Sequence, residues 1–299
     1  MKRTGLFLIA LIMGLGQMFA QQTPALEKSL LWEVSGNGLS SPSYIYGTIH
    51  MINKADFFLT DATLEAMTDS ERFTFEIDME DMSDVSKMMP LLMKSFMIGD
   101  TTLADLLSDE EYESVRAHFE KIGLPLMFLE RIKPMFLSAM TGENMLSMQG
   151  GEQESEIVSY EMEIMKTAKA NKMPIEGLET AEFQMSMFDS IPYKVQANML
   201  VESIKANSDT TEDKQLEEMV QMYKDQDVDG MVAMMDDEGG IGGYEDLLLV
   251  NRNKKWIPIM QEMMKDKTTF FAVGAGHLGG TYGVIRLLKA QGYTLKPLY

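Results

Sequence analysis

Two of the three histidines in the chain stand in the same local context, three residues after a glycine that closes an apolar segment. The first follows Gly47 and is His50; the second follows Gly274 and is His277. A glycine after a strand permits a sharp turn and a close approach of backbone. Each histidine is therefore expected at the carboxyl end of a strand, where α/β folds place their sites. A single Gly-x-x-His would suggest only a structural histidine. The repetition adds a shared site as an equal alternative to two structural histidines.

Two imidazoles need a third ligand to hold a catalytic metal, and a carboxylate is the usual partner. Segment 72–78 alternates apolar and polar residues, which predicts a half-buried strand with Glu76 on its polar face. Glu76 is thus the candidate ligand, with a salt-bridged carboxylate as the plainer alternative. The third histidine, His118, lies in a charged helical segment and is interpreted as helix surface.

Two further residues carry suitable chemistry. Glu179 follows a short predicted strand that includes Ile175, and it could act as a ligand or a general base, or only complement the dipole of the next helix. Arg252 lies in a helix predicted over 244–265. It could stabilise an oxyanion, or it could form a structural ion pair.

Both ends of the chain supply strand-like segments, and most of the middle has helical periodicity. Near the C-terminus, a strand over 268–273, a helix over 282–291 and a strand over 293–298 predict a β-α-β crossover. The prediction is an α/β fold: one domain over 21–299 with a mixed β-sheet and a large helical insertion at about 81–235. Within the insertion, Met89, Met93 and Met97 fall four residues apart, and this stripe is expected to fill a core.

Composition excludes several classes of protein. The formal net charge of −20 disfavours nucleic-acid binding. The absence of cysteine excludes a thiol enzyme, a Cys-ligated zinc site and a cysteine-linked lipoprotein. Residues 1–20 have a basic start, an apolar run over 6–15 and a small residue at Ala20, which predicts a signal peptide and a periplasmic or secreted protein. An uncleaved anchor is the alternative, and no other segment is apolar enough to cross a membrane.

Two motifs suggest other ligands. Segment 274–279 matches the dinucleotide pattern G-x-G-x-x-G, including Gly276, but no acidic residue follows Asp266 to bind a ribose. Segment 225–236 resembles a calcium loop. The plainer interpretation is a turn and a helix cap ahead of a short helix at 231–235, because Gly239 and Gly240 follow too soon for the exit helix of a calcium-binding hand.

Taken together, the chain resembles the TraB/GumN family, which is similar to the Tiki metalloproteases and more distantly to erythromycin esterases and a haem-binding lipoprotein group (a ChaN/EreA-like fold). The resemblance rests on five segments: Tyr46–His50, Phe75–Asp78, Gly177–Thr180 with Gln184, Arg252-Asn253 with Trp256, and Val273–Gly280.

The resemblance to Tiki proteins implies that His50, His277 and Glu76 hold a divalent transition metal, for which manganese, cobalt, iron and zinc are all suitable. Metal-activated water would then attack an amide or ester carbonyl of a peptide or protein substrate. Glu179 is the candidate base and Arg252 the candidate oxyanion partner. The alternative is a non-catalytic module that binds a peptide or haem with the same histidines, and a family member that stabilises a membrane complex is a third possibility.

Overall fold

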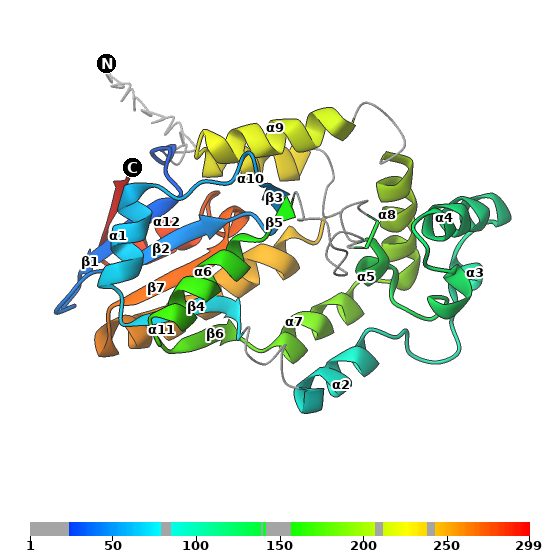
Figure 1. Ribbon diagram of the computed structural model, residues 1–299, viewed down its shortest axis with the longest axis horizontal. Helices are drawn as coiled ribbons and strands as arrows, with labels where there is room; N and C mark the ends of the chain where they lie inside the picture. Colours follow the sequence, from blue (N-terminus) through cyan, green and yellow to red (C-terminus); the bar gives the residue numbers. More distant parts are fainter. Residues whose placement is uncertain (1–23, 79–84, 139, 142–156, 207–211, 238–242) are drawn as a thin grey trace, which may run out of the picture.

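A six-stranded mixed sheet organises the protein (Figure 1). The computed structural model describes residues 24–78, 85–138, 140–141, 157–206, 212–237 and 243–299, so the predicted signal peptide lies outside the described residues. The strands in spatial order are β6 (Ile175–Glu179), β4 (Arg72–Ile77), β7 (Thr269–Gly274), β2 (Ser43–Thr48), β1 (Leu31–Gly36) and β8 (Tyr293–Leu298). The first four run parallel, and β1 is antiparallel to both of its neighbours.

The predicted mixed sheet is confirmed, with one strand contributed from the middle of the chain. This strand, β6, forms the sheet edge beside β4. The C-terminal crossover passes from β7 through α12 (Val284–Ala290) to β8, and both β2 and β1 lie between its two strands. A short antiparallel pair, β3 (Ile52–Asn53) and β5 (Ile157–Val158), stands apart from the main sheet.

Helices cover both faces of the sheet. On β4, Phe73 and Phe75 are fully buried on the face that receives α6 (Tyr160–Ala170). The alternate residues Arg72 and Thr74 bond to Met263 of α11 (Asn251–Asp266) on the opposite face. Because successive side chains of a strand point to opposite faces, β4 is covered by α6 on one side and α11 on the other.

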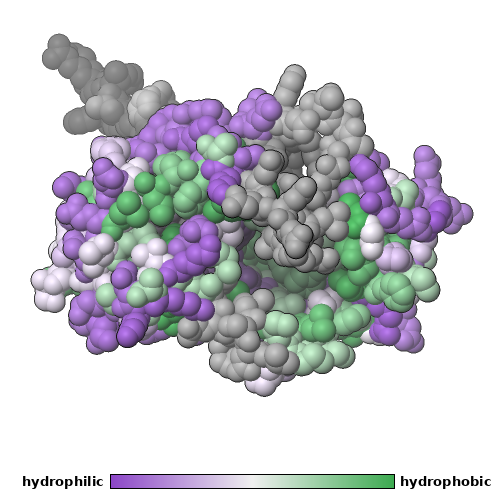
Figure 2. Space-filling view, viewed as in Figure 1, coloured by the Kyte–Doolittle hydropathy of each residue, from purple (hydrophilic) through white to green (hydrophobic). Residues whose placement is uncertain are grey.

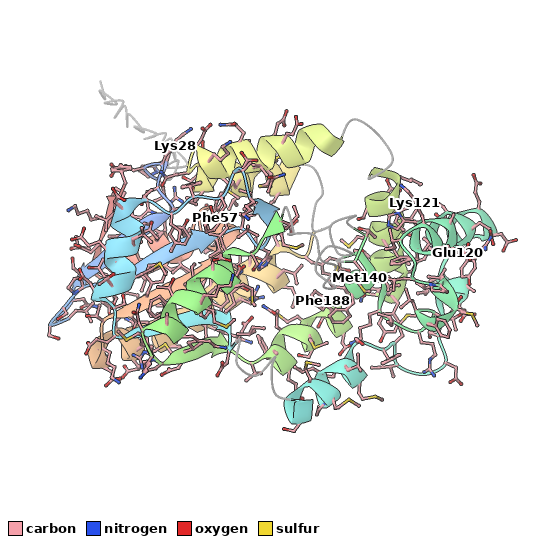
Figure 3. The ribbon with its side chains drawn as sticks, viewed as in Figure 1. Lys28, Phe57, Glu120, Lys121, Met140 and Phe188 are labelled. Atoms are coloured by element: carbon pink, nitrogen blue, oxygen red, sulfur yellow. The ribbon has the colours of Figure 1, made fainter. Side chains whose placement is uncertain are left out.

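The described residues between 81 and 235 contribute to two hydrophobic cores. Tyr160 and Ile164 of α6 and Tyr223 of α9 (Glu212–Lys224) join the sheet core, while Phe119 and Leu200 belong to a separate helical core. We call the part of the molecule built around the sheet the sheet half, and the part built around the core of Phe119 and Leu200 the helical half. Figure 3 labels Phe57 in the sheet half and Phe188 in the helical half. The remaining helices are α1 (Asp61–Asp69), α2 (Val85–Lys94), α3 (Leu103–Leu106), α4 (Asp109–Lys121), η2 (Leu126–Phe128), α5 (Pro134–Ser138), α7 (Ala181–Met187), η4 (Phe188–Ser190), α8 (Tyr193–Ala206), α9 (Glu212–Lys224), α10 (Val228–Asp237), η5 (Asp246–Val250) and η6 (Ala275–His277).

The methionine stripe does not fill a core as predicted. Met89 and Met93 of α2 are 54% and 66% exposed, and α2 buries Leu91 instead. The helix ends at Lys94, so Met97 falls outside it and is buried separately. The assumption of one continuous helical face was therefore wrong. His118 is also less exposed than expected, since its Nε2 lies 3.0 Å from the carbonyl oxygen of Thr141.

The calcium-like segment forms a turn and a helix cap. Asp227 Oδ1 accepts a hydrogen bond from the N–H of Gly230 (2.8 Å), so this side chain caps α10. Its other oxygen pairs with Lys28, and Asp229 pairs with Arg286 of α12. Among the described residues, no helix is both long enough and apolar enough to span a membrane.

Candidate active site

Four predicted site residues lie along the side of the sheet where the parallel strands have their carboxyl ends. Glu179 ends β6, Glu76 is the penultimate residue of β4, His277 ends η6 directly after β7, and His50 follows β2 by two residues. These four strands are neighbours and parallel. Their carboxyl ends therefore meet at the same edge, in the order Glu179, Glu76, His277 and His50.

The two Gly-x-x-His loops pack against each other. A Cβ added to Gly47 would lie 3.1 Å from the Cα of Ala275, so only glycine allows this close approach without a shift of the neighbouring loop. At Gly274, an added Cβ would lie 3.2 Å from Glu76 Oε1, the atom that accepts a hydrogen bond from the Gly274 N–H (2.9 Å). A Cβ added to Gly276 would lie 3.4 Å from the sulfur of Met235, which is ordinary van der Waals contact.

Arg252 lies at the centre of the buried part of the site. Its Nη2 donates to Glu76 Oε2 (2.5 Å) and to Glu179 Oε1 (2.6 Å), and its Nε also donates to Glu179 Oε1 (2.9 Å). The Nη1 atom lies 3.1 Å from Nε2 of His277. The guanidinium therefore joins both carboxylates and the imidazole in one cluster. This cluster is shielded from solvent, because Arg252 is only 6% exposed.

His277 is neutral in this cluster. Burial lowers the pKa of His277 to about 4, and the attraction of Glu76 only partly opposes this. Because Arg252 Nη1 is always a donor, Nε2 of His277 must accept. The ring proton is therefore on Nδ1, which donates to Asn253 Oδ1 (2.6 Å). The ring also packs on Trp256, with centroids 4.4 Å apart.

Glu76 is ionised beside this neutral imidazole. Burial opposes ionisation, but His277, Arg252 and the Gly274 N–H together lower the pKa of Glu76 to about 2. Because His277 carries no charge here, we attribute the stabilisation mainly to Arg252. Oε1 of Glu76 lies 3.6 Å from Nε2 of His277, so an anionic oxygen and a nitrogen lone pair lie next to each other.

Glu179 has both oxygens engaged. Oε1 accepts from Arg252 and from Gln184 Nε2 (3.2 Å), and Oε2 accepts from Trp256 Nε1 (3.1 Å). Gln184 also donates to Glu76 Oε2 (3.1 Å). The carboxylate of Glu179 therefore holds Arg252 in place rather than facing open space.

His50 lies apart from the buried cluster and has its own carboxylate. Its side chain is 76% exposed, and its Nδ1 lies 2.9 Å from Glu161 Oε1 in α6. The same oxygen accepts from Thr48 Oγ1 (2.7 Å). The hydrogen bond to Glu161 raises the pKa of His50 to about 9, although partial burial lowers it. At neutral pH, His50 and Glu161 form an ion pair that leaves Nε2 of His50 free of that bond.

Aromatic residues support the loop that carries His50. The hydroxyl of Tyr223 in α9 donates to the carbonyl oxygen of Gly47 (3.0 Å) and lies 3.4 Å from the hydroxyl of Tyr46. Tyr160, which precedes Glu161, packs its ring against Tyr223 with centroids 5.3 Å apart. The elements that hold the first Gly-x-x-His loop therefore include both α9 and α6.

A cavity of about 350 Å³ connects the exposed and buried parts of the site. His50, Glu161 and Gln184 line it together with Glu76 and several apolar residues. Figure 2 shows a hollow with apolar residues on its visible walls, between the sheet half and the helical half. The cavity brings His50 and Glu76 to a common space.

The comparison with known proteins fits this arrangement. The sequence model of the TraB/PrgY/gumN family matches residues 30–297. The chain belongs to this family. It is also 22% identical, over 321 aligned residues, to the metalloprotease TIKI1 of Danio rerio, with 90% of this chain and 63% of the zebrafish protein covered. The chain thus spans less than two thirds of that relative. No solved structure matches.

Within the described part of this family member, no cluster of three or more His, Asp and Glu side chains is close enough to form a metal site as it stands. Two of the predicted ligands nevertheless have suitable spacing. Two donors each about 2.1 Å from a tetrahedral ion lie roughly 3.4 Å apart, and Glu76 Oε1 and His277 Nε2 are 3.6 Å apart. His50 lines the same cavity as Glu76, so the donor types fit a divalent transition metal.

Sequence reasoning missed Glu161. It is one of two acidic residues in the first turn of α6, where a carboxylate is ordinarily favoured by the helix dipole. Nothing in its local sequence distinguishes it. Gln184, Asn253 and Trp256 were found only through the family resemblance, and the structure places all three in contact with predicted site residues.

Proposed function

We propose that this member of the TraB/PrgY/gumN family is an exported, metal-dependent hydrolase that acts on peptide bonds. The observation that carries the proposal is the matched support of the two motif histidines. His50 is held through Nδ1 by Glu161, and His277 is held through Nδ1 by Asn253. Metal-binding histidines typically donate their other ring N–H to such an oxygen, which fixes the ring and directs Nε2 toward the metal. Nε2 of His277 now lies 3.1 Å from Arg252 Nη1 and accepts its hydrogen bond, so metal binding would replace this bond.

In this proposal His50, His277 and Glu76 hold the ion, and manganese, cobalt, iron and zinc all accept such a donor set. The bound ion would supply Lewis acidity, polarising a carbonyl and lowering the pKa of water. The protein contributes the dry floor of the site, where burial keeps His277 neutral and Arg252 keeps Glu76 ionised.

Arg252 is the candidate partner for negative charge that develops on the substrate. In that role it would exchange one of its present hydrogen bonds, which go to Glu76, Glu179, His277 and the carbonyl oxygen of Leu248. Glu179, with both oxygens engaged, fixes the guanidinium together with Gln184 and Trp256. We therefore assign Glu179 to the positioning of Arg252 in preference to general-base catalysis. Glu161 is a candidate proton acceptor, because it lines the cavity and holds His50.

The relative named as a metalloprotease supports the choice of peptide bonds, and residues 1–20 support export to the periplasm or beyond. The first test is elemental analysis of the protein from residue 21 onward after dialysis against manganese, cobalt or zinc, together with hydrolysis of a peptide pool. We expect bound metal and cleavage in the wild type, and loss of both in His50→Ala and His277→Ala. His118→Ala is the matched control, because its imidazole lies in the helical half on α4.

Circular dichroism of each variant separates loss of function from loss of fold. If the wild type holds no metal and cleaves no peptide, the hydrolase proposal is wrong and the non-catalytic binding module takes its place. Addition of haem then distinguishes the two kinds of binder, since a Soret band that disappears in His50→Ala identifies a haem site.

A further inference from the structure

The cavity beside His50 has an apolar floor. Phe75 of β4 and Ala272 of β7 are direct neighbours in the sheet, and each is only 1% exposed. Both line the cavity, and Ile77 extends the apolar wall beyond Glu76. Because Ala272 has no side-chain atom beyond Cβ, it leaves room above β7. The depth of the cavity is therefore lined by hydrocarbon, although charged groups surround it.

Two methionines lie at the exposed part of the cavity. Met51 directly follows His50 and is 43% exposed, and Met162 directly follows Glu161 and is 41% exposed. They line the same cavity as His50 and Glu161. Methionine is unbranched and polarizable, so it adapts its shape to an apolar ligand. A side chain that enters the cavity would be covered by these two thioethers.

The charges around the cavity disfavour a charged side chain. Glu76 already has Arg252 as its partner, and Glu161 has His50. A substrate lysine would lose hydration against the apolar floor without gaining an unpaired carboxylate. A substrate carboxylate would in addition be repelled by Glu76 and Glu161. An uncharged apolar side chain meets neither penalty.

The size of the cavity indicates what enters it. About 350 Å³ is near the lower end of the roughly 300–1,000 Å³ typical of ligand pockets. A second hollow of about 580 Å³ shares Met51 and continues past Asn53 toward Gln221 of α9. The two hollows offer a side-chain pocket and, next to it, space for the backbone of an extended chain.

We propose that the cavity formed by Phe75, Ile77, Ala272, Met51 and Met162 is a specificity pocket for one large apolar side chain, such as leucine, methionine or phenylalanine, next to the bond that is cleaved. This inference rests on the proposed function, because it assigns a substrate class to the same site. It predicts selection by the apolar residue of an extended peptide and discrimination against acidic residues at that position.

The test uses blocked peptides of one sequence with a single varied residue, which is leucine, alanine, lysine or glutamate. Binding to the metal-free protein from residue 21 onward is measured by titration calorimetry, and cleavage is measured separately with manganese, cobalt or zinc. We expect the leucine peptide to bind about tenfold or more tightly than the alanine peptide, from burial of the additional carbon atoms. The glutamate peptide is expected to bind most weakly.

Two variants make the test specific to this pocket. Met162→Glu places a carboxylate at its mouth and should remove the preference for leucine. Met127→Glu is the matched control, because Met127 is 72% exposed in η2 of the helical half, outside the cavity lining. Preference retained in Met127→Glu and lost in Met162→Glu supports the proposal.

Equal binding of all four peptides, or an unchanged preference in Met162→Glu, overturns the pocket. The outcome also separates the two proposals. Selective binding without cleavage under any metal supports the pocket and contradicts the hydrolase. Cleavage with no preference at the varied position supports the hydrolase and contradicts the pocket.

Discussion

Asp229 connects three separate parts of the chain, and its replacement by asparagine should lower stability by a definable amount. Its Oδ1 accepts from Arg286 Nη1 (2.7 Å) and from the N–H of Gly280 (2.9 Å). Its Oδ2 accepts from Arg286 Nη2 (2.8 Å) and from the N–H of Leu26 (2.8 Å). Asparagine keeps the shape of the side chain but loses the charge and one acceptor.

The size of the expected loss of stability follows from the pKa of Asp229. The hydrogen bonds from Arg286 outweigh burial and lower the pKa of Asp229 from its ordinary value of 3.8 to about 2. A shift of nearly two units corresponds to about 2 kcal/mol. Because the pKa is depressed in the folded state, this stabilisation is fully present above about pH 4 to 5. It is lost as the pH falls toward 2.

Thermal unfolding of the wild type and Asp229→Asn at pH 7 and at pH 3 measures this contribution. At pH 7 the variant should melt about 3–4 °C lower, given the unfolding entropy of a chain of this size, and the difference should shrink at pH 3. Asp225→Asn is the matched control, because the Asp225 carboxylate accepts a local hydrogen bond from Gln221, four residues earlier in the chain. Equal melting temperatures at pH 7, or a difference that grows in acid, would refute the reasoning.

Three further predictions concern the candidate site. Asn253→Leu removes the acceptor of His277 Nδ1, so metal affinity measured by calorimetry should fall about 10–100-fold; unchanged affinity would contradict the assigned role. Glu161→Gln removes the carboxylate that raises the pKa of His50 to about 9. An NMR titration of the metal-free variant should show the pKa of His50 falling toward about 6.5. A pKa of His50 unchanged from the wild type would contradict the ion pair. Metal uptake at pH 7 should release about one proton from His50, measured as the dependence of binding enthalpy on buffer, and no such dependence would show that His50 is not a ligand.

The position of the site residues at the carboxyl ends of the strands could be predicted from the sequence, because the signals for it are local. Each Gly-x-x-His follows its own apolar strand, and the alternation around Glu76 shows which face of its strand is polar. Parallel strands then bring these residues to one edge whatever their order. The order of the strands, and with it the 3.6 Å between Glu76 and His277, depends on contacts about 200 residues apart that no local pattern encodes.

The supporting residues show the limit of sequence reasoning more clearly. Arg252 was open to two interpretations, and its contacts with both carboxylates are visible only in three dimensions. Glu161 has the same helix-start chemistry as many surface glutamates, so its contact with His50 carried no sequence signal. The prediction that the methionine stripe of α2 fills a core was wrong for a different reason. Periodicity predicts which residues share a face of a helix, but not whether another element covers that face.

The charges of the site explain why a protein would keep these groups together. At neutral pH, Glu76 and Glu179 are matched by the single cation of Arg252, while His50 and Glu161 cancel each other. The neutral imidazole of η6 adds no charge, so the metal-free site carries a net charge of about −1. A divalent cation would raise this to about +1, and loss of the His50 proton would return it to zero. If the proposed metal site is correct, burial makes an unbalanced charge costly, so we expect uptake of one divalent ion to be coupled to release of one proton.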